Sequence, residues 1–543
     1  MMDTNYSLRG VVLAGFGLLL LGSAAIGCLD ATTPSDNVLL LGGGGFVLLL
    51  SSVMTGRRGE TTSYKHRRSP DGLDRVLFAW NDSDQFTVRD LLNGGVAIFG
   101  RTGSGKTSSS GKAIANALVR LPGSGGLILA AKPVEDRVMW EKIFKAAGRS
   151  QDLLIFSPDS PLRFNFLDYE MAQGGHTRNI TRTLMTIGET LGSSDTDGRE
   201  DSSFWSKEQE RMIYNAVEVV KLATGRVSAP DLHRFITGAA MSSQQFTSEE
   251  WLAGFHNQCL KTAWEKPKTA MEQHDFELAK EYWLNEFVFM ADKTRSSILT
   301  GVMGILHTFN TGIVRELVSS STNVTPDDLF AGKWVLIDMP PSEWGDIGLF
   351  VAGGWKYLCQ KALLKRVADA RSNVVTIWAD EAQQFVNSFD AHTIAQCRSH
   401  RGCMVFLTQS LHAYYAALPG QSGRHQADSL LTNFHTKLLH ALGDIETANW
   451  ASSLIGKSLQ TFTGGSMTPS EGMYDDLMGT SRYTGNFSQH FESILQPNAF
   501  MHGLRTGGAA NGFVCDCFVI RSGEPFAGGA NWLATSFDQR TPG

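Results

Sequence analysis

Val96-Ala97-Ile98-Phe99-Gly100-Arg101-Thr102-Gly103-Ser104-Gly105-Lys106-Thr107 is the stretch that decides the fold class. Its four leading apolar residues predict a buried strand, and residues 108–119 behind it have the pattern of a helix. The loop between these two elements matches the phosphate-binding loop of nucleotide-binding proteins in full. Its glycines let backbone N–H groups turn inward around phosphates, and the helix N-terminus adds its dipole. We therefore predict an ATP site made of Gly100, Arg101, Thr102, Gly103, Ser104, Gly105, Lys106 and Thr107.

Four residues are expected to carry the chemistry of hydrolysis. The Lys106 ammonium would reach the β- and γ-phosphates, and the Thr107 hydroxyl would ligate Mg²⁺. Residues 374–379 form an apolar run that ends in Asp380 and Glu381. We expect Asp380 to hold Mg²⁺ through its water shell and Glu381 to be the general base for the attacking water. The alternative is that both merely begin a solvated helix, whose N-terminus favours acidic residues.

Three polar residues lie near the next apolar run, residues 403–408. Gln409 leaves that run and is a candidate sensor of the γ-phosphate, although a glutamine in a plain turn is the alternative. Arg398 and Arg401 precede the run. Ring-forming ATPases commonly complete a site with a cation from the neighbouring subunit. Either arginine could serve in this way, and a surface salt bridge is the other reading.

Short apolar runs alternate with helical stretches, as in an α/β fold with a largely parallel sheet. The runs bounded by glycine, proline or polar turns predict buried strands at residues 96–99, 127–131, 153–156, 334–338, 374–379 and 403–408. Between about 170 and 315 the strand signals stop. Apolar residues at helical spacing predict helices in segments such as 204–222, 279–290 and 296–308. Residues 461–491, rich in Gly, Ser and Thr, predict a mobile loop.

These patterns predict a RecA-like nucleotide-binding domain with an inserted all-α domain and an N-terminal two-helix transmembrane anchor. The expected segments are the anchor at residues 1–54, a cytoplasmic juxtamembrane segment at 55–90, the first part of the nucleotide-binding domain at 91–169, the insertion at 170–315 and the second part at 316–543.

The anchor is predicted from two hydrophobic stretches, residues 11–29 and 38–54, which are about as long as a bilayer core requires. A basic cluster follows the second stretch, so the positive-inside rule places most of the chain in the cytoplasm. The alternative is a cleaved signal peptide or a lipoprotein signal that ends at Cys28. That reading would export the ATP site to a compartment without ATP, and we favour the two-span anchor in the lipid bilayer.

Composition excludes little. The formal net charge is -6, so any contact with nucleic acid would need a local basic lining. Seven cysteines without a repeating framework indicate a reducing compartment. Cys397 and Cys403 lie near three histidines, but their spacing fits no common zinc pattern. We read them as a helix end that runs into a buried strand.

The order of these motifs resembles the type IV secretion system coupling proteins, the conjugative DNA translocases of the HerA–FtsK ATPase superfamily. The resemblance is strongest in Ala379-Asp380-Glu381-Ala382, Arg398-Ser399-His400-Arg401-Gly402 and Leu407-Thr408-Gln409-Ser410. It extends to Phe164-Asn165-Phe166-Leu167, where Phe166 replaces a proline. It also covers Ala131-Lys132-Pro133, which lacks the acidic residue of the family's Asp-Pro-Lys but keeps a lysine.

The resemblance implies a homo-hexamer with a central channel in the bacterial inner (cytoplasmic) membrane, anchored as a multi-pass protein. It implies single-stranded DNA, a relaxase and type IV secretion channel components as partners. By the same resemblance, Arg398 matches the family's interface arginine better than Arg401 does, and Gln409 matches its sensor glutamine. Three alternatives stay open: a receptor ATPase for protein substrates only, a double-stranded DNA pump, and an ATP-gated membrane scaffold. The intact Asp380-Glu381 pair disfavours the scaffold.

Overall fold

The computed structural model describes residues 72–192, 201–418, 423–468 and 482–540. Both predicted membrane spans, the basic cluster and Cys28 lie outside these residues. Among the described helices, no single one is long and apolar enough to cross a membrane. Only the bent pair Asp292–Asn310 and Gly312–Val318 meets that test of length and composition, when its two helices are taken together.

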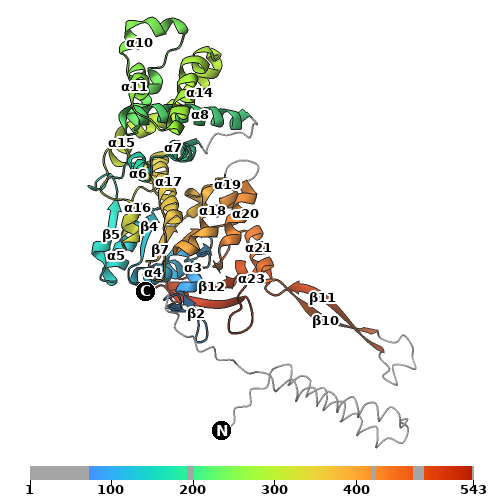
Figure 1. Ribbon diagram of the computed structural model, residues 1–543. Coiled ribbons are helices and arrows are strands. Elements are labelled where there is room, and N and C mark those ends of the chain that lie inside the picture. Colours follow the sequence, from blue (N-terminus) through green and yellow to red (C-terminus); the bar gives the residue numbers. More distant parts are fainter. Residues whose placement is uncertain (1–71, 193–200, 419–422, 469–481, 541–543) are drawn as a thin grey trace, which may run out of the picture. The chain divides into compact units, whose positions relative to one another are not determined.

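The described part of the chain is organised around a nine-stranded sheet with the order β13-β12-β9-β3-β8-β7-β4-β6-β5 (Figure 1). From β9 to β5, neighbouring strands pair in parallel, whereas β12 and β13 add an antiparallel edge. The strands are β3 (Val96–Phe99), β4 (Gly125–Leu129), β5 (Leu153–Phe156), β6 (Trp334–Ile337), β7 (Val375–Ala379), β8 (Gly402–Thr408), β9 (Thr436–Leu439), β12 (Val514–Arg521) and β13 (Trp532–Asp538).

All six predicted strands occur, within two residues of their expected bounds. Most are buried along their whole length, because helices cover both faces of the parallel part of the sheet. Strands β9, β12 and β13 were not predicted. The burial of β12 alternates over its first residues, a pattern typical of a strand with one covered face, and its apolar run at residues 517–520 was not recognised as a strand.

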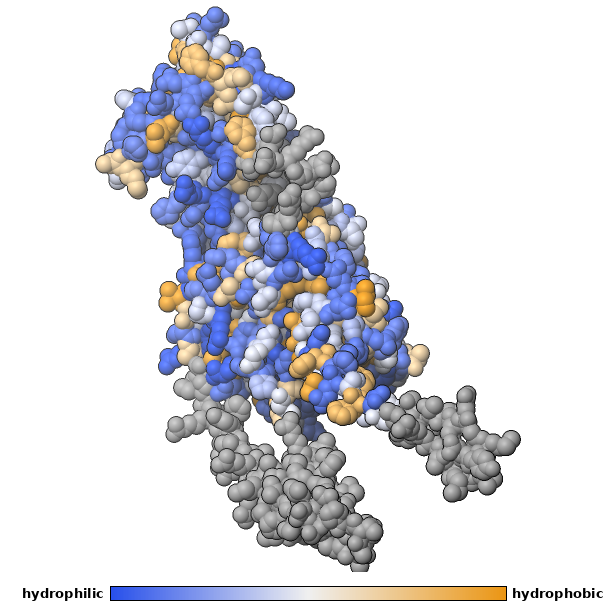
Figure 2. Space-filling view, turned by 90° about the vertical axis from the view of Figure 1, so that its right-hand side faces the viewer, coloured by the Kyte–Doolittle hydropathy of each residue, from blue (hydrophilic) through white to orange (hydrophobic). Residues whose placement is uncertain are grey.

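Alternate residues of the strands feed two separate hydrophobic cores, one on each face of the sheet. On one face, Ile98 and Trp378 pack with the helices α4 (Lys112–Arg120) and α5 (Glu135–Ala146). On the other face, Phe99 and Ile337 pack in the core that includes α17 (Pro341–Lys365). On the side of the molecule shown in Figure 2, hydrophilic residues predominate among the described residues and hydrophobic ones are interspersed between them.

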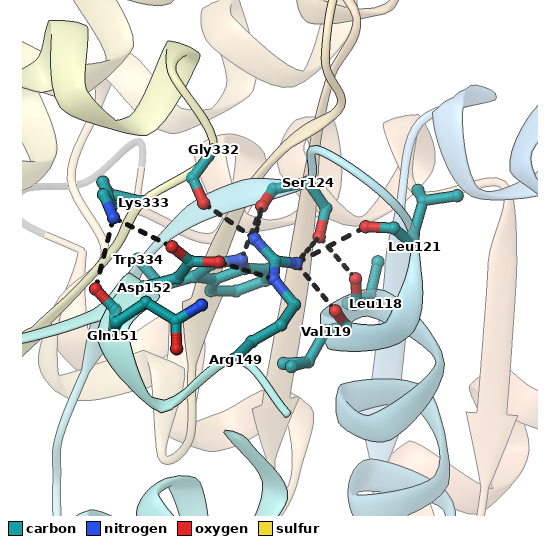
Figure 3. Close-up of polar contacts among 10 residues, drawn as sticks. All are labelled: Leu118, Val119, Leu121, Ser124, Arg149, Gln151, Asp152, Gly332, Lys333 and Trp334. Atoms are coloured by element: carbon teal, nitrogen blue, oxygen red, sulfur yellow. Dashed lines mark hydrogen bonds and ion pairs between the residues drawn. The ribbon is translucent and has the colours of Figure 1, made fainter. Parts of the chain in front are cut away.

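Arg149 connects the ends of several elements through hydrogen bonds (Figure 3). Its guanidinium donates to the carbonyls of Val119, Ser124 and Gly332 at 2.7–2.9 Å, and its Nε lies 2.9 Å from Asp152 Oδ2. The Trp334 indole donates to the same Ser124 carbonyl at 2.9 Å. A planar fork with five donors can satisfy several fixed carbonyls at once. Arg149 therefore joins the end of α4 to the beginnings of β4 and β6.

Between β5 and β6 the described residues form helices and no strands. The predicted helices at 204–222, 279–290 and 296–308 lie inside this region. The helices are α6 (Phe166–Ala172), α7 (Thr177–Gly192), α8 (Asp201–Thr224), α9 (Ala229–Thr237), α10 (Glu249–Ala253), α11 (Phe255–Glu265), α12 (Ala270–Glu281), α13 (Phe287–Phe289), α14 (Asp292–Asn310), α15 (Gly312–Val318) and α16 (Pro326–Phe330). Helix α7 packs along α17, which covers the sheet, so this contact joins the helical region to the sheet.

The prediction of a loop at 461–491 was wrong for the described residues on both sides of 469–481. They form an antiparallel hairpin of β10 (Lys457–Thr468) and β11 (Arg482–Ser493), in which Lys457 pairs with Ser493. Threonine and aromatic residues favour a pleated strand, and they outweigh the glycines and serines on which the loop prediction rested. Several apolar side chains of this hairpin are exposed, including Phe487 and Phe491.

Candidate nucleotide-binding and catalytic site

The loop from Gly100 to Thr107 connects β3 to its helix as predicted, but the helix does not begin as a regular α-helix. Residues Thr107–Gly111 form a π-helical turn, and α4 starts at Lys112. Gly103 and Gly105 have φ values of 76° and 84°, which side chains other than glycine rarely adopt. A Cβ at Gly105 would also lie 2.3 Å from the Cys515 sulfur. Both the backbone conformation and the lack of space for a side chain therefore require glycine at position 105.

The two halves of the predicted site meet at the carboxyl edge of the sheet. Lys106 Nζ lies 3.1 Å from Glu381 Oε1, and the Thr107 hydroxyl donates to Asp380 Oδ2 at 2.9 Å. The side chains of Lys106 and Glu381 are only 7% and 11% exposed, so little water screens this pair. The cluster joins residues that are more than 270 positions apart in the sequence.

Glu381 is held at both carboxylate oxygens. While Oε1 faces Lys106, Oε2 accepts hydrogen bonds from Gln383 at 2.8 Å and from Gln409 at 3.2 Å. Burial alone would raise the pKa of Glu381, but the Gln383 hydrogen bond, the Lys106 charge and the Gln409 hydrogen bond hold the pKa below its usual value. Glu381 also has a left-handed backbone with φ 47°, an uncommon conformation that is frequent at functional sites. The carboxylate is thus ionised and fixed in orientation.

Asp380 is surrounded by donors as well. Its Oδ2 receives the Thr107 hydroxyl and lies 3.2 Å from Lys132 Nζ, and its Oδ1 accepts from the Glu381 amide at 2.9 Å. Burial would lower the pKa of Lys132, but the charge of Asp380 and the hydrogen bond to it raise that pKa on balance. Carboxylate and hydroxyl oxygens are ligands that Mg²⁺ prefers, so Asp380 and Thr107 fit a magnesium site.

Asp136 orders the turn that carries Lys132. Its Oδ2 accepts from the backbone amides of Ala131 and Lys132, both at 2.9 Å. Burial raises the pKa of Asp136 to about 6, and the nearby charge of Asp380 contributes to the increase. The motif at residues 131–133 lacks an acidic residue, and Asp136 supplies a carboxylate to this turn from the first turn of α5.

Arg398 and Arg401 lie outside this cluster. Arg398 is on a 3₁₀ turn, Cys397–His400, and lines a cavity of about 400 Å³ together with Asn93, Asn433 and Glu524. Its guanidinium makes no hydrogen bond or ion pair with any residue that the structure describes. Arg401 instead donates to the carbonyls of Asp369 and Ala370 at 3.2 and 2.8 Å. The interface role of Arg398 stays a prediction.

Gln383 and Lys132 are residues of this cluster that the sequence motifs did not predict to act at the site. Gln383 supports Glu381 and also accepts from the Thr408 hydroxyl at 2.9 Å, so it links the ends of β7 and β8. The position of Gln383, two residues after Glu381, is the one feature of the sequence that could have predicted its role. Lys132 follows β4, whose carboxyl end lies beside that of β7 because the two strands pair in parallel.

Comparison with known families gives two matches that together span most of the chain. Residues 64–328 match the family described as "Type IV secretory system Conjugative DNA transfer". Residues 374–502 match the family described as "TraM recognition site of TraD and TraG". No curated protein matches the chain.

Solved structures share the fold at low sequence identity. The unbound bacterial conjugative coupling protein TrwBdeltaN70 superposes with a TM-score of 0.54 and 13% identity, covering 87% of this chain and 92% of that one. The plasmid coupling protein TrwB in complex with an ATP analogue gives a TM-score of 0.51, and TrwB in complex with ADP and Mg²⁺ gives 0.52. Both of these are 14% identical and cover 84% of this chain and 89% of theirs.

Proposed function

Because the chain belongs to the conjugative coupling proteins of type IV secretion systems, we propose that it is the ATPase that drives DNA into the secretion channel. The observation that carries the proposal is the cluster of Lys106, Thr107, Asp380 and Glu381 at one edge of the sheet. Both TrwB nucleotide complexes named above, one of which also holds Mg²⁺, support ATP and Mg²⁺ as the ligands of this cluster.

Each residue of the cluster has a distinct task in hydrolysis. Lys106 and the amides of the glycine-rich loop bind the β- and γ-phosphates. Thr107 and Asp380 hold Mg²⁺, which neutralises phosphate charge when it is bound. Glu381 accepts the proton of the attacking water, and its lowered pKa keeps it unprotonated at neutral pH. Gln383 and Gln409 fix the carboxylate through its second oxygen.

The remaining expectations belong to the same proposal. The ring is a homo-hexamer in which Arg398 of one subunit completes the site of the next, and its lack of a partner among the described residues suits that role. The residues at 11–29 and 38–54 anchor the ring in the inner membrane, with most of the chain in the cytoplasm. The cargo is single-stranded DNA with its bound relaxase, passed to the channel components.

The test compares ATP turnover of the full-length protein without DNA, with single-stranded DNA and with duplex DNA. We expect single-stranded DNA to stimulate turnover, and we expect Lys106→Ala and Glu381→Gln to abolish it. DNA binding should weaken steeply with salt, because phosphate contacts release counterions. Stimulation by duplex DNA alone would point to the double-stranded pump, and turnover indifferent to DNA would favour a receptor for protein substrates. Turnover that survives both substitutions would contradict the catalytic assignment.

A further inference from the structure

His440 is a buried residue that touches the nucleotide-binding loop from behind. It follows β9, and its backbone amide donates to the Phe99 carbonyl at 2.9 Å, at the point where β3 enters the loop. Its side chain is fully buried. A Cβ at Gly100 would lie 2.9 Å from the His440 Cβ, so the loop and the histidine are in close contact.

Two hydrogen bonds determine which ring nitrogen of His440 carries the proton. Nδ1 lies 3.0 Å from the Asp516 carbonyl oxygen, which can only accept, so Nδ1 is the donor. Burial lowers the pKa of His440 to about 4, so the ring is neutral and Nε2 has a free lone pair. Nε2 therefore accepts from the Ser110 hydroxyl, which lies 2.7 Å away.

Ser110 belongs to the π-helical turn that follows Lys106. In this turn the Gly111 amide donates to the Lys106 carbonyl at 2.9 Å, five residues back. Such turns are rare and are frequently found at functional sites. A regular α-helix beginning at Thr107 would pair its amides four residues back. The Ser110 hydroxyl, drawn to His440, favours the wider turn and with it the position of Lys106 and Thr107.

Asp516 extends this connection to the surface. Its carboxylate binds the Arg505 guanidinium at 2.8 and 2.9 Å and accepts from the Ser536 hydroxyl at 2.7 Å. The Arg505 side chain is half exposed. The contacts thus run from the half-exposed Arg505 and the strands β12 and β13, through the Asp516 backbone and His440, to the turn behind Lys106.

We propose that His440 is a positioning residue, which acts through Ser110 to hold the π-helical turn and so sets the affinity of the site for nucleotide. The inference rests on the proposed function in that it assumes nucleotide binding at Gly100–Thr107. It goes beyond that function because it states that residues on β12 and after β9, none of which is proposed to be catalytic, control the conformation of the loop.

Two amide substitutions separate the two hydrogen bonds of His440. In His440→Asn the side-chain NH₂ lies near the place of Nδ1 and can still donate to the Asp516 carbonyl. The short bond from Ser110 to Nε2 is lost, and only the Lys106 carbonyl, 3.4 Å from the Ser110 hydroxyl, is left to accept from it. In His440→Gln the amide oxygen reaches the place of Nε2 and accepts from Ser110. Ser110→Ala removes the same bond from the other side with little effect on packing. His256→Asn is the matched control, since His256 is another buried histidine, bonded through Nδ1 to the Phe235 carbonyl in the helical region.

The measurement is equilibrium binding of a fluorescent ATP analogue to the full-length protein, with the thermal melting temperature of each variant. We expect Ser110→Ala and His440→Asn each to weaken binding about tenfold, as one buried hydrogen bond would. The double variant should bind no more weakly than either single one, because both remove one bond. His440→Gln and His256→Asn should bind within about threefold of the wild type.

Several results would overturn the inference. Unchanged affinity in Ser110→Ala would do so alone, even if His440→Asn failed to fold. Additive losses in the double variant, or a loss in His440→Gln equal to that in His440→Asn, would show that His440 does not act through Ser110. Failure of the wild type to bind nucleotide would instead contradict the proposed function, so the two failures are distinguishable.

Discussion

Lys132 Nζ lies 3.2 Å from Asp380 Oδ2, the same oxygen that accepts the Thr107 hydroxyl. A lysine ammonium and a divalent cation are attracted to the same carboxylate, and two cations that share it repel one another. Lys132 balances the charge of Asp380 and Glu381, and we expect it to oppose the proposed binding of Mg²⁺ at Asp380.

Lys132→Met should lower the Mg²⁺ concentration needed for half-maximal ATP turnover, by about fivefold. The loss of a positive charge beside Asp380 makes the site more negative, and the divalent ion gains from that change. Lys132→Arg keeps the charge and should leave the Mg²⁺ requirement close to that of the wild type. A higher Mg²⁺ requirement in Lys132→Met would mean that the lysine helps to build the metal site.

Gln383→Met should reduce kcat about tenfold and move the acid limb of the pH–rate profile upward. Gln383 donates to Glu381 and holds its pKa down, so without it the carboxylate takes up a proton at a higher pH. Gln384→Met is the control, because Gln384 is exposed on the same short helix. An unshifted acid limb would show that Glu381 does not limit the rate at low pH.

Arg398→Ala should reduce the rate of ATP turnover about a thousandfold, because the arginine would stabilise the transition state in the neighbouring site. Mixed with Lys106→Ala subunits, however, it should regain part of the activity. In such mixed rings some interfaces combine an intact Lys106 with an intact Arg398 from the neighbour. Mixtures without any recovery would count against a role in the neighbouring site. Arg401→Ala, which removes bonds to carbonyls within its own subunit, should not be rescued by mixing.

Arg149→Met should lower the free energy of unfolding by about 3 kcal/mol, because it removes the guanidinium that donates to the Val119, Ser124 and Gly332 carbonyls and to Asp152. Arg149→Lys keeps a positive charge near Asp152, but a single ammonium cannot donate to all the carbonyls that the guanidinium reaches. Its loss of unfolding free energy should therefore be intermediate. Urea denaturation measures both. The exposed Arg137, paired with Glu141 on the same helix, is the control, and Arg137→Met should cost less than about 1 kcal/mol.

His256 should make the protein sensitive to mild acid. Burial lowers its pKa to about 4, from about 6.5 in the unfolded chain, so the unfolded chain takes up the proton first as the pH falls. Its contribution to stability is complete above pH 6.5 and is lost progressively toward pH 4. Between pH 7 and pH 5, His256→Asn should lose about 2 kcal/mol less than the wild type in urea denaturation. Equal losses would mean that His256 is protonated in the folded protein.

The parallel part of the sheet could be predicted because its strands are short, apolar and closed by turn residues. The antiparallel edge was not predicted, although β12 carries an apolar run at residues 517–520. Its direction in the sheet depends on its pairing with β9, which no local pattern shows. The hairpin of β10 and β11 was mistaken for a loop because its strands are rich in polar residues and glycine. The hydrogen-bonded pairing of the two strands, which a single segment of sequence does not show, makes them strands.

In the candidate site, the spacing of the motifs predicted Lys106, Thr107, Asp380, Glu381 and Gln409, and the structure brings these five side chains together. Lys132 and His440 join the site only through the order of strands, which brings the ends of β4 and β9 beside those of β7 and β3. No local pattern carries that information. The Ser110–His440 bond connects residues 330 positions apart and is visible only in three dimensions.

The sheet order has a consequence for the making of the protein. Strand β3 carries the nucleotide-binding loop near the beginning of the described chain, yet both of its neighbours, β8 and β9, lie between residues 402 and 439. At roughly 5–20 residues per second, a ribosome needs on the order of tens of seconds to reach them. Throughout that interval both edges of this apolar strand lack their partners, and unpaired strand edges of a partly made chain are prone to aggregation.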